Sequence, residues 1–567
     1  MNSVSDTGSS RFSYKTLDDL VEACVEFYHS RLEKSADKPE VYHRREQLAG
    51  WVRKFHAECG TLSPQVEESI ENLRSGSCVF LMTAHQPNLF AYSGVLRKAT
   101  LNQVLADKLA ETLKLPVVTF FGLADQDFAD DRWVRSALLP DVERRDGTLE
   151  LRVDLPEKIM LNKVRKPSRK VIDDWRSAVT DWIERNVGIA SRSLSSRGVN
   201  SQLCRQELNT NFRDFWEIVQ EAYEKAEFCS DFNSFVLSKV VNDVWKYPTL
   251  FSRFSQCQRV FGREFNFLLS RFSDYSKLLK EVTMNQNSSA GGVNEQEFEI
   301  APFWHHCECG SKARLMVEKK DGELIGHGNC LRCGKEYEIN LELEESPESQ
   351  EYMAHVSARS VSMPLVLFPG LGVCCYVGGA GGKEYLRQAK YVGDGLGISF
   401  PPVVVWRPKD VYLGIGQLGA LLIYNALSGT LELSQLVSFE SQLKEKIDRV
   451  MKQVENLELK KKEISKTSDL SKKETIDRLK ALSIRQDEIR RENDFSLLSR
   501  NLKLVENVKT VLGLYPCMID YAVNVGLKKT SDSWSAFLKD NGDLGSEVHL
   551  TTSLQGSVSD TPLKLSV

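Results

Sequence analysis

Two short apolar runs separated by one stretch of helical period limit what this chain can fold into. The first, CVFLMTA, starts at Cys78 and ends just before His85, and the second, LPVVTFFGLAD, ends at Asp125. The residues between them, LRKATLNQVLADKLAETL, have the spacing of a helix. Parallel strands need a long crossover connection, and a helix is the usual one. The order strand, helix, strand therefore predicts an α/β protein with a doubly wound parallel sheet.

Length and composition are consistent with such a protein. The chain has 567 residues, 41% apolar and 27% charged, with a formal net charge of -4. These values are typical of a globular protein of two to four structural units and give no general attraction to nucleic acid or anionic lipid. The start of the chain lacks the pattern of a signal peptide, and no later run is apolar enough to span a membrane. We expect a cytoplasmic protein whose thirteen cysteines are mostly reduced.

Changes in patterning divide the chain into seven segments. A block after residue 364, LVLFPGLGVCCYVGGAGGKEYLRQAKYVGDGLGISFPPVVVWRP, brings back strand-like runs and extends the sheet toward residue 430. The tail from about 541 is rich in Ser, Thr and Gly, and we expect it either to be mobile or to supply a terminal strand. The segments are an N-terminal helical segment (1–75), the first half of the core (76–170), a helical insertion (171–300), a zinc-ribbon-like insert (301–345), the second half of the core (346–436), a helical hairpin (437–512) and a C-terminal segment (513–567).

The hairpin segment has a heptad pattern. Apolar residues follow alternating steps of four and three with one place taken by Lys461, at Leu443, Ile447, Val450, Val454, Leu457 and Ile464. A polar stretch at 465–473 interrupts the pattern, which then returns with Ile476, Leu479, Leu482 and Ile489. This predicts an antiparallel coiled-coil hairpin. Its apolar seam must be covered by the returning helix, by the core or by a second subunit, and we expect a homodimer through it.

Four cysteines form the most specific local pattern of the chain. Cys307 and Cys309 are followed after twenty residues by Cys330 and Cys333, and each pair is followed by a glycine. Two thiolate pairs in tight turns suit a tetrahedral zinc ion, and four thiolates leave no position for a reacting water molecule. We therefore expect a structural zinc site, although four reduced cysteines in a β-hairpin would share this spacing.

Polar residues follow both strands of the first unit. The turn 85–88 reads His-Gln-Pro-Asn, and the turn 125–127 reads Asp-Gln-Asp. Parallel sheets bind ligands beyond the carboxyl ends of their strands, so both turns are expected to face one cleft. The first could bind phosphate or carboxylate at the start of a helix, or be an ordinary turn capped by Asn88. The second could bind magnesium, hold a substrate amine or act as a general base, or be an exposed acidic loop.

A glycine-rich turn follows the third strand-like run. Gly378, Gly379, Gly381 and Gly382 surround one alanine, and Lys383 comes directly after them. The spacing fits neither a Walker loop nor a dinucleotide fingerprint, so it indicates a phosphate-binding turn only weakly. The same glycines could serve close packing of the backbone.

These three motifs resemble those of the cysteine-adding enzymes of bacillithiol synthesis, the BshC family. Where the family has a motif like TGQQxGLFxGP, this chain has TAHQPNLFAYSGV. Where the family has EDHDFEE, this chain has ADQDFADD, which differs from the family motif at Ala124 and Gln126. The third motif is the most similar, since YVGGAGGKEYLRQAK resembles YVGGPGExxYWxQLK. The resemblance covers about residues 76–515, and the cysteine cluster is not part of the family pattern. The first motif is also similar to the IHQPNYxPWxGxxxK signature of the WbqC-like family.

The resemblance implies a Rossmann-like core of the nucleotidylyltransferase or class I tRNA-synthetase type. It implies a ligase that joins cysteine to the amine of glucosaminyl malate. A ligase of this kind must activate a carboxylate, commonly with ATP and magnesium. The implied catalytic residues are His85, Gln86, Asp125 and Asp127, and the implied substrate-binding residues are Asn88, Lys98, Gly378, Gly379, Gly381, Lys383 and Tyr385. Two other functions stay open: a non-catalytic binding protein whose hairpin and cysteine cluster recruit partners, and a nucleotidyl transferase.

Overall fold

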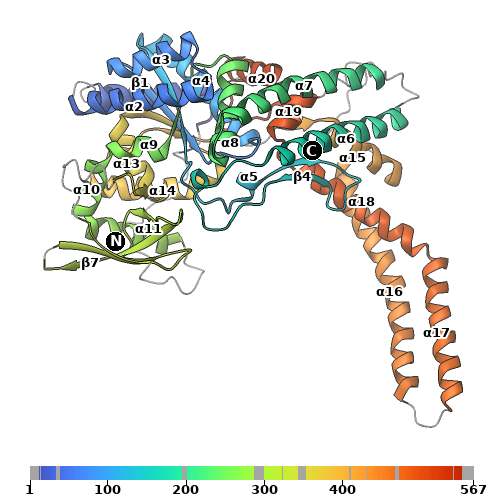
Figure 1. Cartoon of the computed structure of the whole chain (residues 1–567). Coiled ribbons are helices and arrows are strands. Elements are labelled where there is room, and N and C mark those ends of the chain that lie inside the picture. The colour runs from blue at the N-terminus through green and yellow to red at the C-terminus, as the bar shows by residue number, and fades with distance from the viewer. Residues whose placement is uncertain are drawn as a thin grey trace.

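The fold is known from a computed structural model, which combines a central sheet, many helices and one long projecting helix pair (Figure 1). None of the helices in its described residues is long and apolar enough to cross a lipid bilayer. The structure describes residues 12, 14–33, 39–194, 201–286, 299–321, 323–341, 353–407, 410–430, 432–466, 471–540 and 542–551.

Five strands form an all-parallel sheet in the order β12-β11-β1-β2-β5. This confirms the predicted α/β protein with a parallel sheet. Helix α4 (Ser93–Leu113) connects β1 to β2, as the sequence indicates. The strands are β1 (Val79–His85), β2 (Val117–Leu123), β5 (Leu250–Arg253), β11 (Val373–Val377) and β12 (Val403–Val404).

Both faces of the sheet are buried, which explains why its strands are continuous apolar runs. Alternate residues of β1 point to opposite faces, so Val79 and Leu81 join one hydrophobic core while Phe80 and Met82 join the other. Helices α1 and α4 cover the first face, and α3, α13 and α14 cover the second. The bounds are α1 (Leu17–Phe27), α2 (Pro39–Cys59), α3 (Pro64–Ser75), α13 (Ser362–Leu371) and α14 (Lys383–Leu396).

The strand order reverses beside β1. The chain passes from β1 to β2 and β5 on one side, and later returns to add β11 and β12 on the other. The edge strand β5 has only four residues and lies within 171–300, the segment expected to be a helical insertion. That segment therefore supplies a strand as well as helices, because four buried residues are too few to show a strand pattern among helical residues. Its helices are α6 (Arg169–Leu194), α7 (Ser201–Lys225), α8 (Cys229–Ser238), α9 (Phe254–Cys257), α10 (Gly262–Ser270) and α11 (Phe272–Gln286).

A second five-stranded sheet, antiparallel in the order β10-β6-β7-β8-β9, carries the four clustered cysteines. Its strand β10 packs against α13, and Phe303 on β6 contacts Phe265 on α10. We call strands β6 to β9 with their turns the cysteine module. The bounds are β6 (Phe303–His306), β7 (Lys312–Lys320), β8 (Glu323–Cys330), β9 (Glu336–Asn340) and β10 (Val356–Ala358).

The projecting hairpin consists of α16 (Leu436–Lys466) and α17 (Lys472–Glu492), which lie side by side and extend away from the body of the protein (Figure 1). Helix α18 (Phe495–Gly513) leads back to the core. Val450, Val454 and Ile489 are buried between the two long helices. The returning helix thus covers part of the apolar seam.

The remaining elements flank the core. The predicted terminal strand exists as β14, which pairs in parallel with β13, and the tail beyond it is outside the described residues. These elements are α5 (Arg132–Arg135), β3 (Ser136–Pro140), β4 (Thr148–Arg152), β13 (Val411–Leu413), α15 (Ile415–Ser428), α19 (Met518–Asn524), α20 (Leu527–Asp540) and β14 (His549–Thr551).

Candidate functional site

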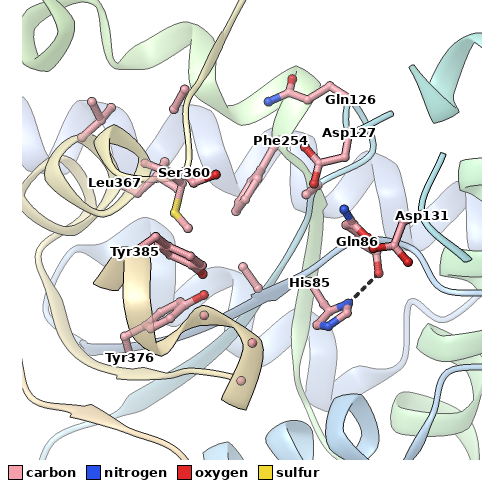
Figure 2. Close-up of a pocket in the computed structure, with 18 of the residues that line it drawn as sticks. His85, Gln86, Gln126, Asp127, Asp131, Phe254, Ser360, Leu367, Tyr376 and Tyr385 are labelled. Atoms are coloured by element: carbon pink, nitrogen blue, oxygen red, sulfur yellow. Dashed lines mark hydrogen bonds between the residues drawn. The ribbon is translucent and has the colours of Figure 1, made fainter. Parts of the chain in front are cut away.

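A cavity of about 440 Å³ opens at the carboxyl ends of β1, β2 and β11, where the strand order reverses (Figure 2). This is the place where open parallel sheets usually bind ligands. Of the residues predicted from sequence, the cavity is lined by His85, Gln86, Lys98, Asp127, Gly379, Gly381 and Tyr385. Gln126 and Asp131 of the ADQDFADD motif also line it, whereas sequence reasoning did not single out Tyr92, Trp133, Phe254, Trp304 and Tyr376.

His85 ends β1 and stays neutral. Its Nδ1 lies 3.0 Å from the main-chain oxygen of Gln86. A carbonyl oxygen only accepts, so we assign the proton to Nδ1, which leaves Nε2 with a free lone pair. Burial, and to a smaller extent the nearby Lys98 ammonium, lowers the pKa of His85 to about 3. The ring is therefore able to accept a hydrogen bond from a ligand at neutral pH but is a weak base.

Lys98 is a buried cation at the edge of the same cavity. Its side chain is 6% exposed, and its Nζ donates to the main-chain oxygen of Ala84 at 2.9 Å. Burial lowers the pKa of Lys98 to about 7. A Cβ atom at position 379 would lie 3.2 Å from Nζ, so Gly379 leaves the room that the lysine occupies. Among the described lining residues, only Lys98 carries an ammonium or guanidinium group, which makes it the natural partner of an anionic ligand group.

Asp127 and Tyr385 provide polar groups elsewhere in the lining. The Asp127 side chain is 40% exposed, and its Oδ1 lies 3.9 Å from the Nζ of Lys312. Tyr385 is hydrogen-bonded to Tyr376, and burial raises the pKa of both phenols, so both stay neutral. A Cβ atom at Gly382 would lie 2.9 Å from the Tyr385 hydroxyl, so the glycine turn packs directly against this ring. Figure 2 shows the two tyrosines facing the His85 side of the cavity.

Asp125 is turned away from the cavity although it stands two residues before Asp127. Its carboxylate accepts hydrogen bonds from the main-chain N–H of Ser255 at 3.0 Å, from the Ser255 hydroxyl and from the Asn162 amide at 3.1 Å. Burial raises its pKa, and these donors oppose that rise. In this geometry Asp125 joins the loops after β2 and β5, and it does not reach a ligand in the cavity.

Three other predicted residues also lie outside the cavity lining. Asn88 is 4% exposed and does not cap α4, because the N-cap of that helix is Tyr92. The interpretation of Asn88 as a capping residue is therefore wrong. Lys383 is exposed at the first position of α14. Gly378 lines a smaller neighbouring cavity instead.

That second cavity has a volume of about 170 Å³ and shares Lys98, Gly379 and Gly381 with the first. Arg97 also lines it, but the charge of Arg97 is compensated by a buried ion pair with Asp410 at 2.9 Å. Its guanidinium also lies over the Trp406 ring, 3.8 Å from the centroid. The charge free to meet an anion at the junction of the two cavities is thus that of Lys98.

The four clustered cysteines are brought together as the sequence predicts. Their sulfur atoms all lie within 4.8 Å of one another, with Cys307 and Cys333 at 3.6 Å and Cys309 and Cys330 at 3.5 Å. Zinc bound by four sulfurs at about 2.3 Å would separate them by about 3.8 Å, so the donor set is compatible with a structural zinc ion. Each turn needs a glycine, because Gly310 and Gly334 have φ of 84° and 74°.

Comparison with known proteins gives no independent assignment. No protein-family model matches the chain, and no curated protein matches it. The case for a function therefore depends on the residues around the two cavities and on the motifs that bring them there.

Proposed function

We propose that this protein is a ligase that joins an amino acid to the amine of a sugar-like acceptor, as the resemblance to the BshC family implies. One observation carries the proposal: three motifs far apart in the sequence line the same cavity. They contribute His85 and Gln86, then Asp127, and then the glycine turn with Tyr385. The resemblance rests on these same three motifs. They are distant in the sequence, and the folding of the chain brings them together at one cavity.

The strand order supports a Rossmann-like core. In such folds the chain builds outward from a central strand in one direction and then in the other, and nucleotides bind at the reversal. Here the reversal is between β1 and β11, and both cavities open beside it. ATP, with magnesium, would supply the activation that a carboxylate needs, and its phosphates would lie against Lys98 and the glycine turn.

The two sides of the larger cavity suit the two substrates. Lys98 would bind the carboxylate or a phosphate, while Asp127 and the Tyr385 hydroxyl would orient the acceptor amine. The nitrogen of that amine attacks the activated carbonyl carbon, the leaving group departs with its electron pair, and the nitrogen gives up a proton to water or to Asp127. His85 would accept a hydrogen bond from the substrate through Nε2. A zinc ion bound in the cysteine cluster would have a structural role and would not take part in the reaction.

Purified protein incubated with ATP, cysteine and glucosaminyl malate tests the proposal directly. We expect an amide product by mass spectrometry, formed together with pyrophosphate, ADP or phosphate. Release of pyrophosphate with nucleotide transfer to the acceptor, and no amide, would make the protein a nucleotidyl transferase. Binding of these compounds without any turnover, over all amino acids and amino-sugar acceptors tested, would support the non-catalytic alternative.

A further inference from the structure

We propose that the cysteine cluster positions one wall of the cavity, and that Lys312 is the residue through which it holds Asp127. The inference concerns any ligand of the cavity and does not depend on the ligase chemistry. The cysteine module already reaches the cavity, because Trp304 on β6 is part of the lining. Trp304 stands three residues before Cys307, so the first cluster ligand and the cavity wall belong to one short segment.

The main chain of Ser311 and Lys312 is tied to both cysteine turns. The N–H of Leu331, inside the Cys330–Cys333 turn, donates to the main-chain oxygen of Lys312 at 2.9 Å. In the other turn, the N–H of Cys307 donates to the oxygen of Ser311 at 2.8 Å. A change in either turn therefore moves the backbone from which the Lys312 side chain starts.

The side chain of Lys312 extends from the module to the loop after β2. It is 4% exposed, and its Nζ lies 3.9 Å from Asp127 Oδ1 and 5.2 Å from the centroid of the Phe128 ring. A buried ammonium needs a compensating charge, and among the described residues Asp127 forms its only ion pair. Lys312 thereby restricts where the Asp127 carboxylate is able to point, and Asp127 lines the cavity.

A second connection runs through the main chain of residues 159–162. Met160 donates from its N–H to the oxygen of Gly310, which follows Cys309, at 2.9 Å. The next residue, Leu161, donates to the oxygen of Asp127, also at 2.9 Å. In the other direction, Ala129 donates to the oxygen of Ile159 at 2.8 Å. The segment 159–162 is thus held between the cysteine module and the loop that carries Asp127.

Hydrogen exchange with and without the metal tests this coupling in the full chain. Elemental analysis should first show about one zinc per chain, lost on treatment with a strong chelator. We expect the amides of Ala129, Met160 and Leu161 to exchange at least about tenfold faster after zinc removal, while those of β1 and β11 keep their rates. Unchanged exchange in 127–129 and 159–162 of the zinc-free protein would overturn the proposal, as would a protein that never binds zinc.

Substitution of Lys312 tests the same link with the metal in place, which matters if zinc removal unfolds the whole chain. Lys312→Met should keep its zinc and yet show faster exchange at Asp127, Phe128 and Ala129, and Lys312→Arg should restore most of the protection. The matched control is Lys335→Met, because Lys335 belongs to the same module but pairs with the exposed Glu308. Equal protection in Lys312→Met and wild type, or equal loss in the Lys335→Met control, would show that Lys312 does not position Asp127.

Discussion

The cavity and the helical hairpin both bury a polar side chain, but they satisfy it to different degrees. In the cavity, the Lys98 ammonium donates to one main-chain oxygen, and burial lowers its pKa to about 7. In the hairpin, the Gln486 amide donates to the oxygen of Val454 at 3.0 Å and to Glu458 at 2.9 Å, and it accepts from Lys461. The two side chains are buried to nearly the same extent.

This difference separates a binding group from a structural one. A buried cation without a counter-charge costs stability, and a protein retains such a group where a ligand completes it. A buried amide whose donors and acceptor all have partners costs little and fixes the register of two helices, because a shifted helix would leave it unpaired. We therefore expect substitutions at the cavity to change binding and turnover, and substitutions in the hairpin to change local stability.

The largest effect is expected for the polar residues of the cavity. His85→Ala and Asp127→Ala should each reduce turnover in the ligase assay about a hundredfold or more, because each removes one positioned polar group from the site. The melting temperature of His85→Ala should stay near that of wild type, since this side chain belongs to neither hydrophobic core of the sheet. That of Asp127→Ala should fall, because the buried Lys312 ammonium loses its counter-charge, but the variant should still fold. Asp154→Ala is the control, because Asp154 is 95% exposed and forms its one ion pair within the described residues with Arg152.

Two folded variants with near-normal turnover would mean that this cavity is not the active site. Attention would then move to the smaller cavity beside Gly378, which shares the glycine turn but has neither His85 nor Asp127 in its lining. If variants of that second cavity were active as well, neither cavity would be the active site, and the difference between cavity and hairpin would not reflect function.

Binding of an anion should depend on the charge of Lys98. Sulfate, used as the probe because it stays a dianion between pH 6 and pH 9, should bind about tenfold more tightly at pH 6 than at pH 9, because the pKa of about 7 leaves Lys98 protonated only at the lower pH. His85, with a pKa of about 3, and the Tyr385 phenol, whose pKa is raised, do not titrate in this range. Isothermal titration calorimetry measures the affinities.

Two variants test whether Lys98 is the group that binds the anion. Lys98→Met should bind the probe weakly at both pH values, whereas Lys98→Arg should bind at both if the larger group fits beside Gly379. Lys98→Met should also be more stable than wild type below pH 7. The sign follows from linkage: the folded pKa is below the unfolded value, so wild-type stability rises with pH between about 7 and 10.5. A pH dependence that persists in Lys98→Met would assign it to another group.

In the hairpin, Gln486→Ala should reduce the local free energy of unfolding by about 1–2 kcal/mol, because the Val454 oxygen and the Lys461 ammonium lose a buried partner. Hydrogen exchange of the α16 amides measures it. Probe binding and turnover should stay unchanged. Gln442→Ala is the control, since Gln442 is an exposed residue of α16, the other long helix of the hairpin. A loss of turnover in Gln486→Ala would show instead that the hairpin is coupled to the cavity.

The smallest effect on the cavity is expected from association through the hairpin. We expect the full chain to be a homodimer, because apolar side chains remain exposed along the long helices, among them Leu459 at 57% and Ile476 at 55%. Light scattering of the full chain and of a variant without residues 440–505 compares the masses. A monomeric full-length protein, or a dimer that survives the deletion, would show that association does not use the hairpin.

Patterns local in sequence were sufficient for much of the fold. The apolar runs before His85 and Asp125 predicted two neighbouring parallel strands, because a strand buried on both faces must be apolar throughout. The spacing of Cys307 to Cys333 predicted one cluster, since the paired residues lie in turns. The heptads predicted the two long helices. Strand β5 escaped prediction because its four residues carry no periodic signal.

The sequence by itself placed the candidate residues at the right edge of the sheet, because a residue that follows a parallel strand must emerge there. Only the tertiary structure decided which of them face the cavity. Asp125 and Asp127 are alike in sequence, yet Ser255 and Asn162 bind the first and draw it inward, while the second is left in the lining. Trp304 and Lys312 reach the site from the cysteine module. Side-chain direction depends on contacts with residues distant in the chain, and no local pattern contains that information.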